Sequence, residues 1–225
     1  MKGLIKHNLY AVESTLKGYL CGVLLSILAT CCFRFIFSDA TLQTIANFAS
    51  YVIMGSFAGL PFTLLHNLSK SQWTRFELTL PITRKDVIKS RYLSFLIFTC
   101  FALVSFLLLN LVNYLLGIDL NLDIFFNFYT LTTCFILCLA VPAFLHPLTL
   151  ICGIDKGEIL FFISVACALI VCSLLPMVLF GQLIASMSST IVSLYLFQCS
   201  SILLSFALFV GSYFISQKIY ARQDL

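Results

Sequence analysis

Long stretches without a charged residue alternate with short polar segments along the whole chain. Five stretches lack Lys, Arg, Asp and Glu: residues 18–33, 40–69, 92–118, 124–154 and 159–217. A helix needs about 20 apolar residues to cross a bilayer. The last stretch, 59 residues long, therefore holds two spans, and each of the others holds one. The first stretch is short, but Arg34 can extend its side chain toward water from the end of it. The sequence predicts an all-α membrane protein with six transmembrane helices at 18–37, 43–66, 93–117, 125–148, 159–180 and 191–215.

An amphipathic helix is predicted before the first span, at residues 1–17. Its apolar positions recur at helical intervals and its charged residues occupy other faces; the apolar positions are Leu4, Ile5, Leu9, Val12 and Leu16. Such a helix is typical of a chain that lies on the membrane surface before it enters the bilayer.

The composition and the distribution of charge predict the orientation. The chain is 61% hydrophobic and 10% charged, with a mean hydropathy of +1.06, whereas a soluble domain carries about 25% charged residues. If both termini face the cytoplasm, 12 of the 13 lysines and arginines lie on that side and only Arg34 lies outside. This asymmetry predicts cytoplasmic termini. The net charge of +4 then reflects membrane orientation, so no nucleic-acid partner is expected.

Three prolines, Pro61, Pro142 and Pro176, can each break or kink a span. Pro176 sits where the fifth span is expected to end, and the residues after it are too apolar for an ordinary outer loop. We expect short helices or a re-entrant turn there. The predicted organisation is an interfacial helix at 1–17, a six-span domain at 18–217 with a cytoplasmic loop at 67–92 and an apolar extracellular segment at 176–190, and a cytoplasmic tail at 218–225.

The residue types that carry most membrane chemistry are missing from the predicted spans. Spans two to six contain no acidic residue, lysine or arginine, although ion-coupled carriers place such residues there. No P-loop, HExxH or GxSxG motif occurs, so we expect no catalytic site, no metal site and no cofactor bound by this chain. If the chain transports a substrate, its energy comes from elsewhere.

The cysteines and two histidines of the spans have an ordinary interpretation and a chemical one. Free cysteine suits an apolar core, and only Cys134 and Cys138 share a helical spacing that a metal would need. His66 and His146 fall at similar depth near the cytoplasmic ends of spans, so a haem held by both is the alternative to histidines that reach water. We expect the ordinary interpretation in both cases.

Six of the 13 lysines and arginines fall in one segment, Ser69–Tyr92, which reads SKSQWTRFELTLPITRKDVIKSRY. Thr74-x-x-Glu77 and Thr83-x-x-Asp86 each resemble a capping box at the start of a helix. Pro81 makes the first of these helices short. The segment is therefore predicted to form a short helix, a Leu-Pro turn, and a second helix that continues into the third span.

On the first short helix, Trp73, Phe76 and Leu80 share one face, while Arg75 and Glu77 point elsewhere. An aromatic anchor with flanking charges is typical of a protein-interaction hot spot. The alternative is a helix that lies on the lipid surface, with its cations at anionic headgroups. The residues by themselves leave both interpretations open.

The loop pattern W-x-x-F-E-x-T-L-P-I-T-R-x-D-V-I-x-S-R-Y-L, which begins at Trp73, resembles the loop between spans two and three of permeases of type-2 ATP-binding-cassette exporters. The amphipathic start, MKGLIKHNLY, and the six-span length match that family as well. The resemblance implies a bacterial inner-membrane permease without an ATPase site of its own. It also implies a second permease chain, identical or different, and a separate cytoplasmic ATPase that binds ATP and Mg. Permeases that export amphipathic peptides, such as phenol-soluble modulins, are the most similar members.

The resemblance also assigns candidate residues. The family's coupling helix, which docks in a groove of the ATPase, maps onto Trp73–Leu80. The residues expected at the ATPase are Trp73, Arg75, Phe76, Glu77, Leu80, Pro81 and Arg84.

Polar residues of the spans are candidates for the substrate path: Asn47, Ser50, Ser56, Asn110, Asn113 and Gln198. Gly55 and Gly59 are expected to let helices pack closely, within the chain or between two chains.

Two other functions are compatible with the sequence. A membrane-embedded binding subunit of an uptake system also has six spans and a partner ATPase, but its outer loops need conspicuous polar residues, and this chain has few. A membrane interaction or immunity protein without transport function would need no ATPase. The predicted function is the permease subunit of an exporter for amphipathic or hydrophobic molecules, most of all peptides.

Overall fold

The computed structural model describes residues 2–34, 39–71, 73, 83–116, 124–153, 156–186 and 190–222. Within these ranges the protein forms α-helices and no strand. The helices are α1 (Lys2–Ala11), α2 (Glu13–Phe33), α3 (Asp39–Ala58), α4 (Leu60–Lys70), α6 (Arg84–Leu115), α7 (Ile124–Cys152), α8 (Gly157–Ser186) and α9 (Thr190–Arg222). The predicted all-α class is confirmed.

Several described segments are long and apolar enough to cross a membrane. Five qualify by length and composition: Glu13–Phe33, Phe48–Lys70, Arg84–Leu115, Leu131–Cys152 and Tyr195–Arg222. A shorter apolar segment, Gly157–Cys172, falls on the fifth of the predicted spans. The chain is thus a multi-pass membrane protein, and the count of six spans stays a prediction.

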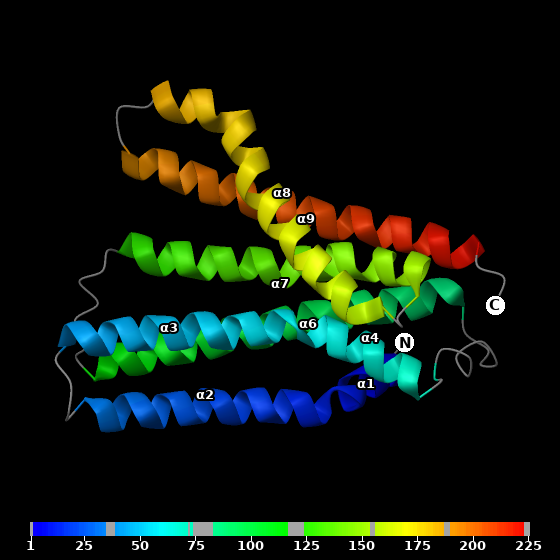
Figure 1. Cartoon of the computed structure of the whole chain (residues 1–225), viewed down its shortest axis with the longest axis horizontal. Coiled ribbons are helices and arrows are strands. Elements are labelled where there is room, and N and C mark those ends of the chain that lie inside the picture. Colours follow the sequence, from blue (N-terminus) through cyan, green and yellow to red (C-terminus); the bar gives the residue numbers. More distant parts are fainter. Residues whose placement is uncertain are drawn as a thin grey trace.

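The long helices lie side by side in one elongated bundle, and α8 crosses it obliquely (Figure 1). The N-terminal helix α1 lies at the end of the bundle where α4 and α9 end and α6 begins, and we call this the α1 end. The helix ends Lys70, Arg84 and Arg222 lie there, whereas Arg34 follows α2 at the opposite end. The cations that the sequence predicts to be cytoplasmic therefore gather at one end of the bundle.

The α1 end is expected to face the cytoplasm. In intact cells, a cysteine introduced at the exposed Ser71 should stay unlabelled by a membrane-impermeant maleimide, and one at the exposed Thr41, near the other end, should be labelled. The natural cysteines are first replaced, and lysed cells show that both new thiols can react. Strong labelling of Ser71→Cys in intact cells would reverse the assigned orientation.

The structure differs from the sequence prediction at three helix boundaries. The N-terminal segment divides at Val12 into α1 and α2, so it is not one helix over 1–17. The second predicted span breaks at Gly59, between α3 and α4, with Pro61 in the first turn of α4. By contrast, α8 continues through Pro176 to Ser186, where an interruption was expected. A helix can keep its course at a proline in a membrane bundle because neighbouring groups satisfy the freed carbonyl.

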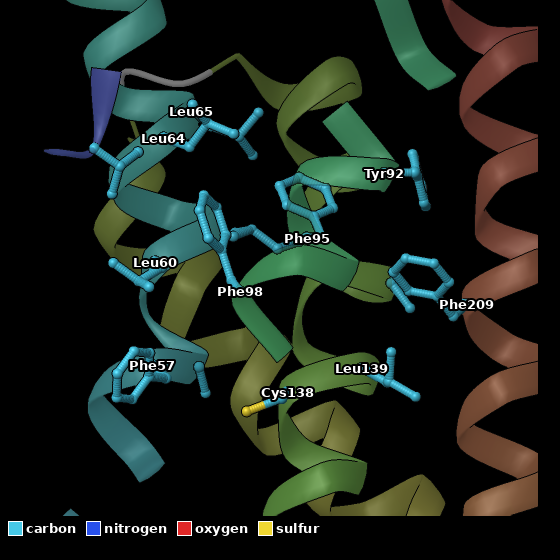
Figure 2. Packing of buried hydrophobic residues seen from close by; sticks show 14 of the residues in the cluster. Phe57, Leu60, Leu64, Leu65, Tyr92, Phe95, Phe98, Cys138, Leu139 and Phe209 are labelled. Carbon is cyan, nitrogen blue, oxygen red and sulfur yellow. The ribbon is translucent and has the colours of Figure 1, made fainter. Parts of the chain in front are cut away.

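The largest apolar cluster joins the helices from α2 to α9, and Figure 2 shows its part between α3, α4, α6, α7 and α9. Aromatic rings of α6, among them Phe95 and Phe98, are buried between Leu60 and Leu64 of α4 on one side and Leu139 of α7 on the other. Many outward-facing side chains are also apolar; Leu24 on α2, for example, is 61% exposed. An apolar surface of this kind is expected to face lipid or a second membrane protein.

Candidate functional site

The charged loop is described only at its two ends. Trp73 and Arg84 belong to the described residues; the other predicted ATPase contacts lie outside them, namely Arg75, Phe76, Glu77, Leu80 and Pro81. The face shared by Trp73, Phe76 and Leu80 therefore remains a prediction. What the structure adds is how the ends of the loop are attached to the bundle.

The first end of the loop is attached to α1. The Trp73 ring stacks on the His7 ring, with centroids 3.7 Å apart and planes 14° from parallel. Nearby, the Asn67 amide nitrogen donates a hydrogen bond to the Ala11 carbonyl at 2.7 Å. Trp73 is half-buried and packs against the main apolar cluster. One face of Trp73 is thus in use within the chain, which the sequence did not reveal because His7 lies far away along it.

The second end of the loop begins α6 as predicted. The Thr83 hydroxyl accepts a hydrogen bond from the Asp86 backbone N–H at 3.2 Å and donates one to the Asp86 carboxylate at 2.7 Å. These contacts satisfy a free N–H group of the first turn and place a negative charge at the positive end of the helix. The predicted Thr83-x-x-Asp86 helix start is confirmed.

Arg84 links α6 to the last turn of α9. Its guanidinium donates hydrogen bonds to the carbonyl oxygens of Tyr220 and Ala221, at 3.2 and 3.3 Å. Carbonyl groups at a helix C-terminus lack partners in their own helix, and a cation there also meets the negative end of the helix dipole. Arg84 was predicted to contact the ATPase; the structure places its guanidinium on α9.

A buried polar network joins α6, α7 and α9 near the α1 end. The Tyr92 hydroxyl lies 2.6 Å from the Ser212 hydroxyl and 2.9 Å from the Ser216 hydroxyl. Ser216 also bonds His146 Nδ1 at 3.0 Å, and the Ser212 hydroxyl donates to the Ala143 carbonyl at 2.6 Å. Only the i, i+4 spacing of the two serines hints at this network in the sequence.

The network gives His146 a structural role. Its ring is fully buried in edge contact with Tyr92 and Phe95, whereas His66 stacks against Phe62. Within the described residues, no group of three His, Cys, Asp or Glu side chains could hold a metal ion. The bond from Nδ1 to Ser216 makes His146 a hydrogen-bonding group between α7 and α9. Arg91 of α6 adds a further contact with α9, since its guanidinium lies over the Tyr220 ring at 5.9 Å.

Together these contacts attach both ends of the loop to the helix bundle. The loop leaves α4 beside α1 and enters α6, and α6 is bonded to α9 at Arg84 and again two turns later at Tyr92. A force applied to the loop therefore acts on α1, α6 and α9 together. A partner protein that binds the loop could therefore move these three helices together.

The predicted substrate-path residues whose side chains the structure describes lie in different surroundings. Ser50 and Asn113 are buried, the Asn110 amide bonds the Phe106 carbonyl of its own helix, and the side chain of Asn47 lies outside the described residues. The other two line separate hollows, Ser56 in a groove between α2 and α3 and Gln198 in a cavity between α7, α8 and α9.

The groove between α2 and α3 has a volume of about 350 Å³. It is open because a side-chain carbon built at Gly18 or Gly22 would meet no atom within 4 Å. The same holds for Gly55, so this glycine makes no close helix contact with the described chain, whereas a side-chain carbon built at Gly59 would come within 3.9 Å of the Phe161 ring of α8. Sequence reasoning missed Gly18 and Gly22, although their i, i+4 spacing equals that of Gly55 and Gly59.

The cavity between α7, α8 and α9 is smaller, about 140 Å³. Its walls are mostly apolar, with a few hydroxyl, thiol and amide groups; the lining residues are Thr133, Ile136, Leu137, Ala168, Leu169, Cys172, Phe197, Gln198 and Ser201. Among the residues that the structure describes, no charged side chain lines this cavity or the groove.

Comparison with known proteins identifies one family. The family model described as ABC-2 family transporter protein matches residues 3–221, which is nearly the whole chain. No curated protein and no solved structure matches the chain.

Proposed function

This chain belongs to the ABC-2 family of transporter proteins, and we propose that it is the permease of an exporter for amphipathic or hydrophobic molecules, most of all peptides. Membership of the family makes it the membrane subunit of an ATP-binding-cassette transporter, whose partner is an ATPase of that type. The match over residues 3–221 is the observation that carries this proposal. The substrate class and the direction of transport are proposed from the features of the chain discussed next.

The lining of the two hollows supports the substrate class. Both are walled by apolar side chains with scattered Ser, Thr and Gln groups, and the described lining of each contains no charged side chain. An ion or a highly polar solute would lose its hydration there without compensation. A molecule with one large apolar face and few hydrogen-bonding groups would lose little.

The partners are proposed from the charged loop, whose described ends lie at the α1 end. The coupling helix at Trp73–Leu80 binds the ATPase on the cytoplasmic side, and ATP and Mg are held by that subunit. Because one permease of six spans is half of a transporter, a second copy or a similar chain completes it in a bacterial inner membrane. Export is the proposed direction for two reasons. The loop pattern resembles that of exporter permeases, and the predicted outer loops have few of the polar residues that an uptake subunit would need.

The proposed partnership is tested by co-expression. The chain, tagged at its C-terminus, is co-expressed with the ATP-binding-cassette ATPase encoded beside its gene and purified in mild detergent. The account predicts that the ATPase is recovered in a 1:1 ratio with the chain. If the ATPase stays in the soluble fraction while the chain is folded and abundant, the proposed partnership is wrong.

Purified chain without the ATPase is expected to hydrolyse no ATP. No phosphate-binding P-loop occurs in the sequence, so there is no site where the triphosphate would be held for attack by water. Phosphate release is measured after purification, beside a mock preparation from cells that lack the chain. Sustained hydrolysis above the mock preparation would show that the chain has a nucleotide site.

A further inference from the structure

The cavity between α7, α8 and α9 has the size of one small ring. Its volume is about 140 Å³, and an engineered protein cavity of about 150 Å³ is known to bind benzene. Ala168, fully buried, leaves the space that a larger residue would fill. Leu169 is 48% exposed and also lines the cavity, so the cavity reaches the outer surface of α8. An apolar group can therefore enter it from the bilayer.

One polar group in this cavity lacks a partner. Gln198 is only 3% exposed, and its Oε1 accepts a hydrogen bond from the Thr132 hydroxyl at 2.6 Å. The Gln198 amide nitrogen has no hydrogen-bond partner in the part of the chain that the structure describes. This nitrogen is not among the fully enclosed polar atoms that lack a partner, so it stays accessible as a donor to a molecule in the cavity.

We propose that the cavity is a binding subsite for an apolar group that carries a carbonyl oxygen, with the Gln198 amide as the donor to that oxygen. The walls bind the apolar part and exclude water, and the Gln198 N–H selects the acceptor. The Thr132 hydroxyl donates to the side-chain carbonyl of Gln198, which lines the cavity, so the amide nitrogen remains for the bound molecule. A hydrophobic side chain beside its own peptide carbonyl has this chemistry, as has a lipid acyl ester. This inference rests on the proposed function only in assigning the carbonyl to an exported molecule.

The site is tested with two probes of one shape. 4-Fluoroacetophenone carries a carbonyl, and 4-fluoro-α-methylstyrene has a methylene in its place. Each is titrated into purified chain in lipid nanodiscs, without ATPase, and its ¹⁹F signal is followed. A saturable shift is expected for the ketone, with about fivefold weaker binding of the styrene, since a net hydrogen bond is worth about that factor. In Gln198→Leu the two probes should bind equally, and in Ala168→Phe, where the ring fills the cavity, neither should bind.

Absence of saturable binding in the natural chain, or equal affinity for both probes there, overturns the subsite; this comparison needs no variant to fold. Nanodiscs of ether lipids, which have no ester carbonyl, separate the two sources. Unchanged ketone affinity in ether lipids supports an exported molecule as the occupant, whereas tighter binding means that lipid esters compete for the cavity and overturns that assignment. If the chain transports but binds neither probe, this inference fails and the proposed function stands.

Discussion

Replacing Trp73 and Phe76 with alanine should release the ATPase subunit while the permease stays inserted and folded. Fully burying one large apolar side chain contributes about 1.5–3 kcal/mol. Since one face of Trp73 is already covered by His7, loss of both side chains should weaken the contact at least about 10-fold. The measurement is the recovery of the co-expressed ATPase with tagged permease. Undiminished recovery with the double variant would contradict the assignment of the coupling helix.

Two controls separate the causes of such a loss. His7→Ala removes the ring on which Trp73 stacks, and should leave ATPase recovery largely intact if Phe76 and the outer face of Trp73 make the contact. A variant neutralised at Lys85 and Lys89 tests the lipid-surface alternative. If that alternative holds, this variant loses membrane binding of the loop and the aromatic variant keeps the ATPase.

Truncation of Tyr92 should give the largest loss of stability within the chain. Tyr92→Phe leaves the Ser212 and Ser216 hydroxyls buried with one partner fewer, at a cost of about 1–3 kcal/mol. Tyr92→Ala also opens a cavity between α6, α7 and α9, and should cost about 3–5 kcal/mol. The free energy of unfolding in mixed micelles measures both.

Tyr114 provides the matched control, because it lies on the same helix α6 but is 71% exposed. Tyr114→Phe should leave the free energy of unfolding unchanged within about 0.5 kcal/mol, as is usual for exposed positions. If Tyr92→Phe were as stable as Tyr114→Phe, the network would not hold α6 to α9, and the attachment of the loop to the bundle would lose its main support.

Local features of this protein could be predicted from its sequence. The apolar stretches follow directly from the absence of charge, and Thr83 with Asp86 forms a helix start within four consecutive residues. The break of the second span at Gly59 lies beside Pro61, where the sequence allowed one, whereas the continuity of α8 at Pro176 was not predicted, because the course of a helix at a proline depends on what its neighbours satisfy.

The contacts between distant residues could not be predicted. Tyr92 and Ser212 are 120 residues apart, and Arg84 and Tyr220 are 136 apart. In a bilayer, an apolar face toward lipid and an apolar face toward a neighbouring helix look alike in sequence, so the pattern does not fix which faces meet. For the same reason Ser50 and Asn113 were candidates for the substrate path, although both are buried. Gln198 lines a cavity only because small residues such as Ala168 lie opposite.

The most direct test of the account is ATP-driven movement of an amphipathic peptide through the chain. Inside-out membrane vesicles are prepared from cells that express the chain together with its ATPase, and from cells that express the ATPase alone. A fluorescent amphipathic helical peptide is added outside, and its accumulation in the vesicles is measured with ATP and with ADP. We expect accumulation that requires both ATP and the chain and that is abolished by Trp73→Ala/Phe76→Ala. Equal accumulation in the presence and absence of the chain would contradict its role as an export permease for such peptides.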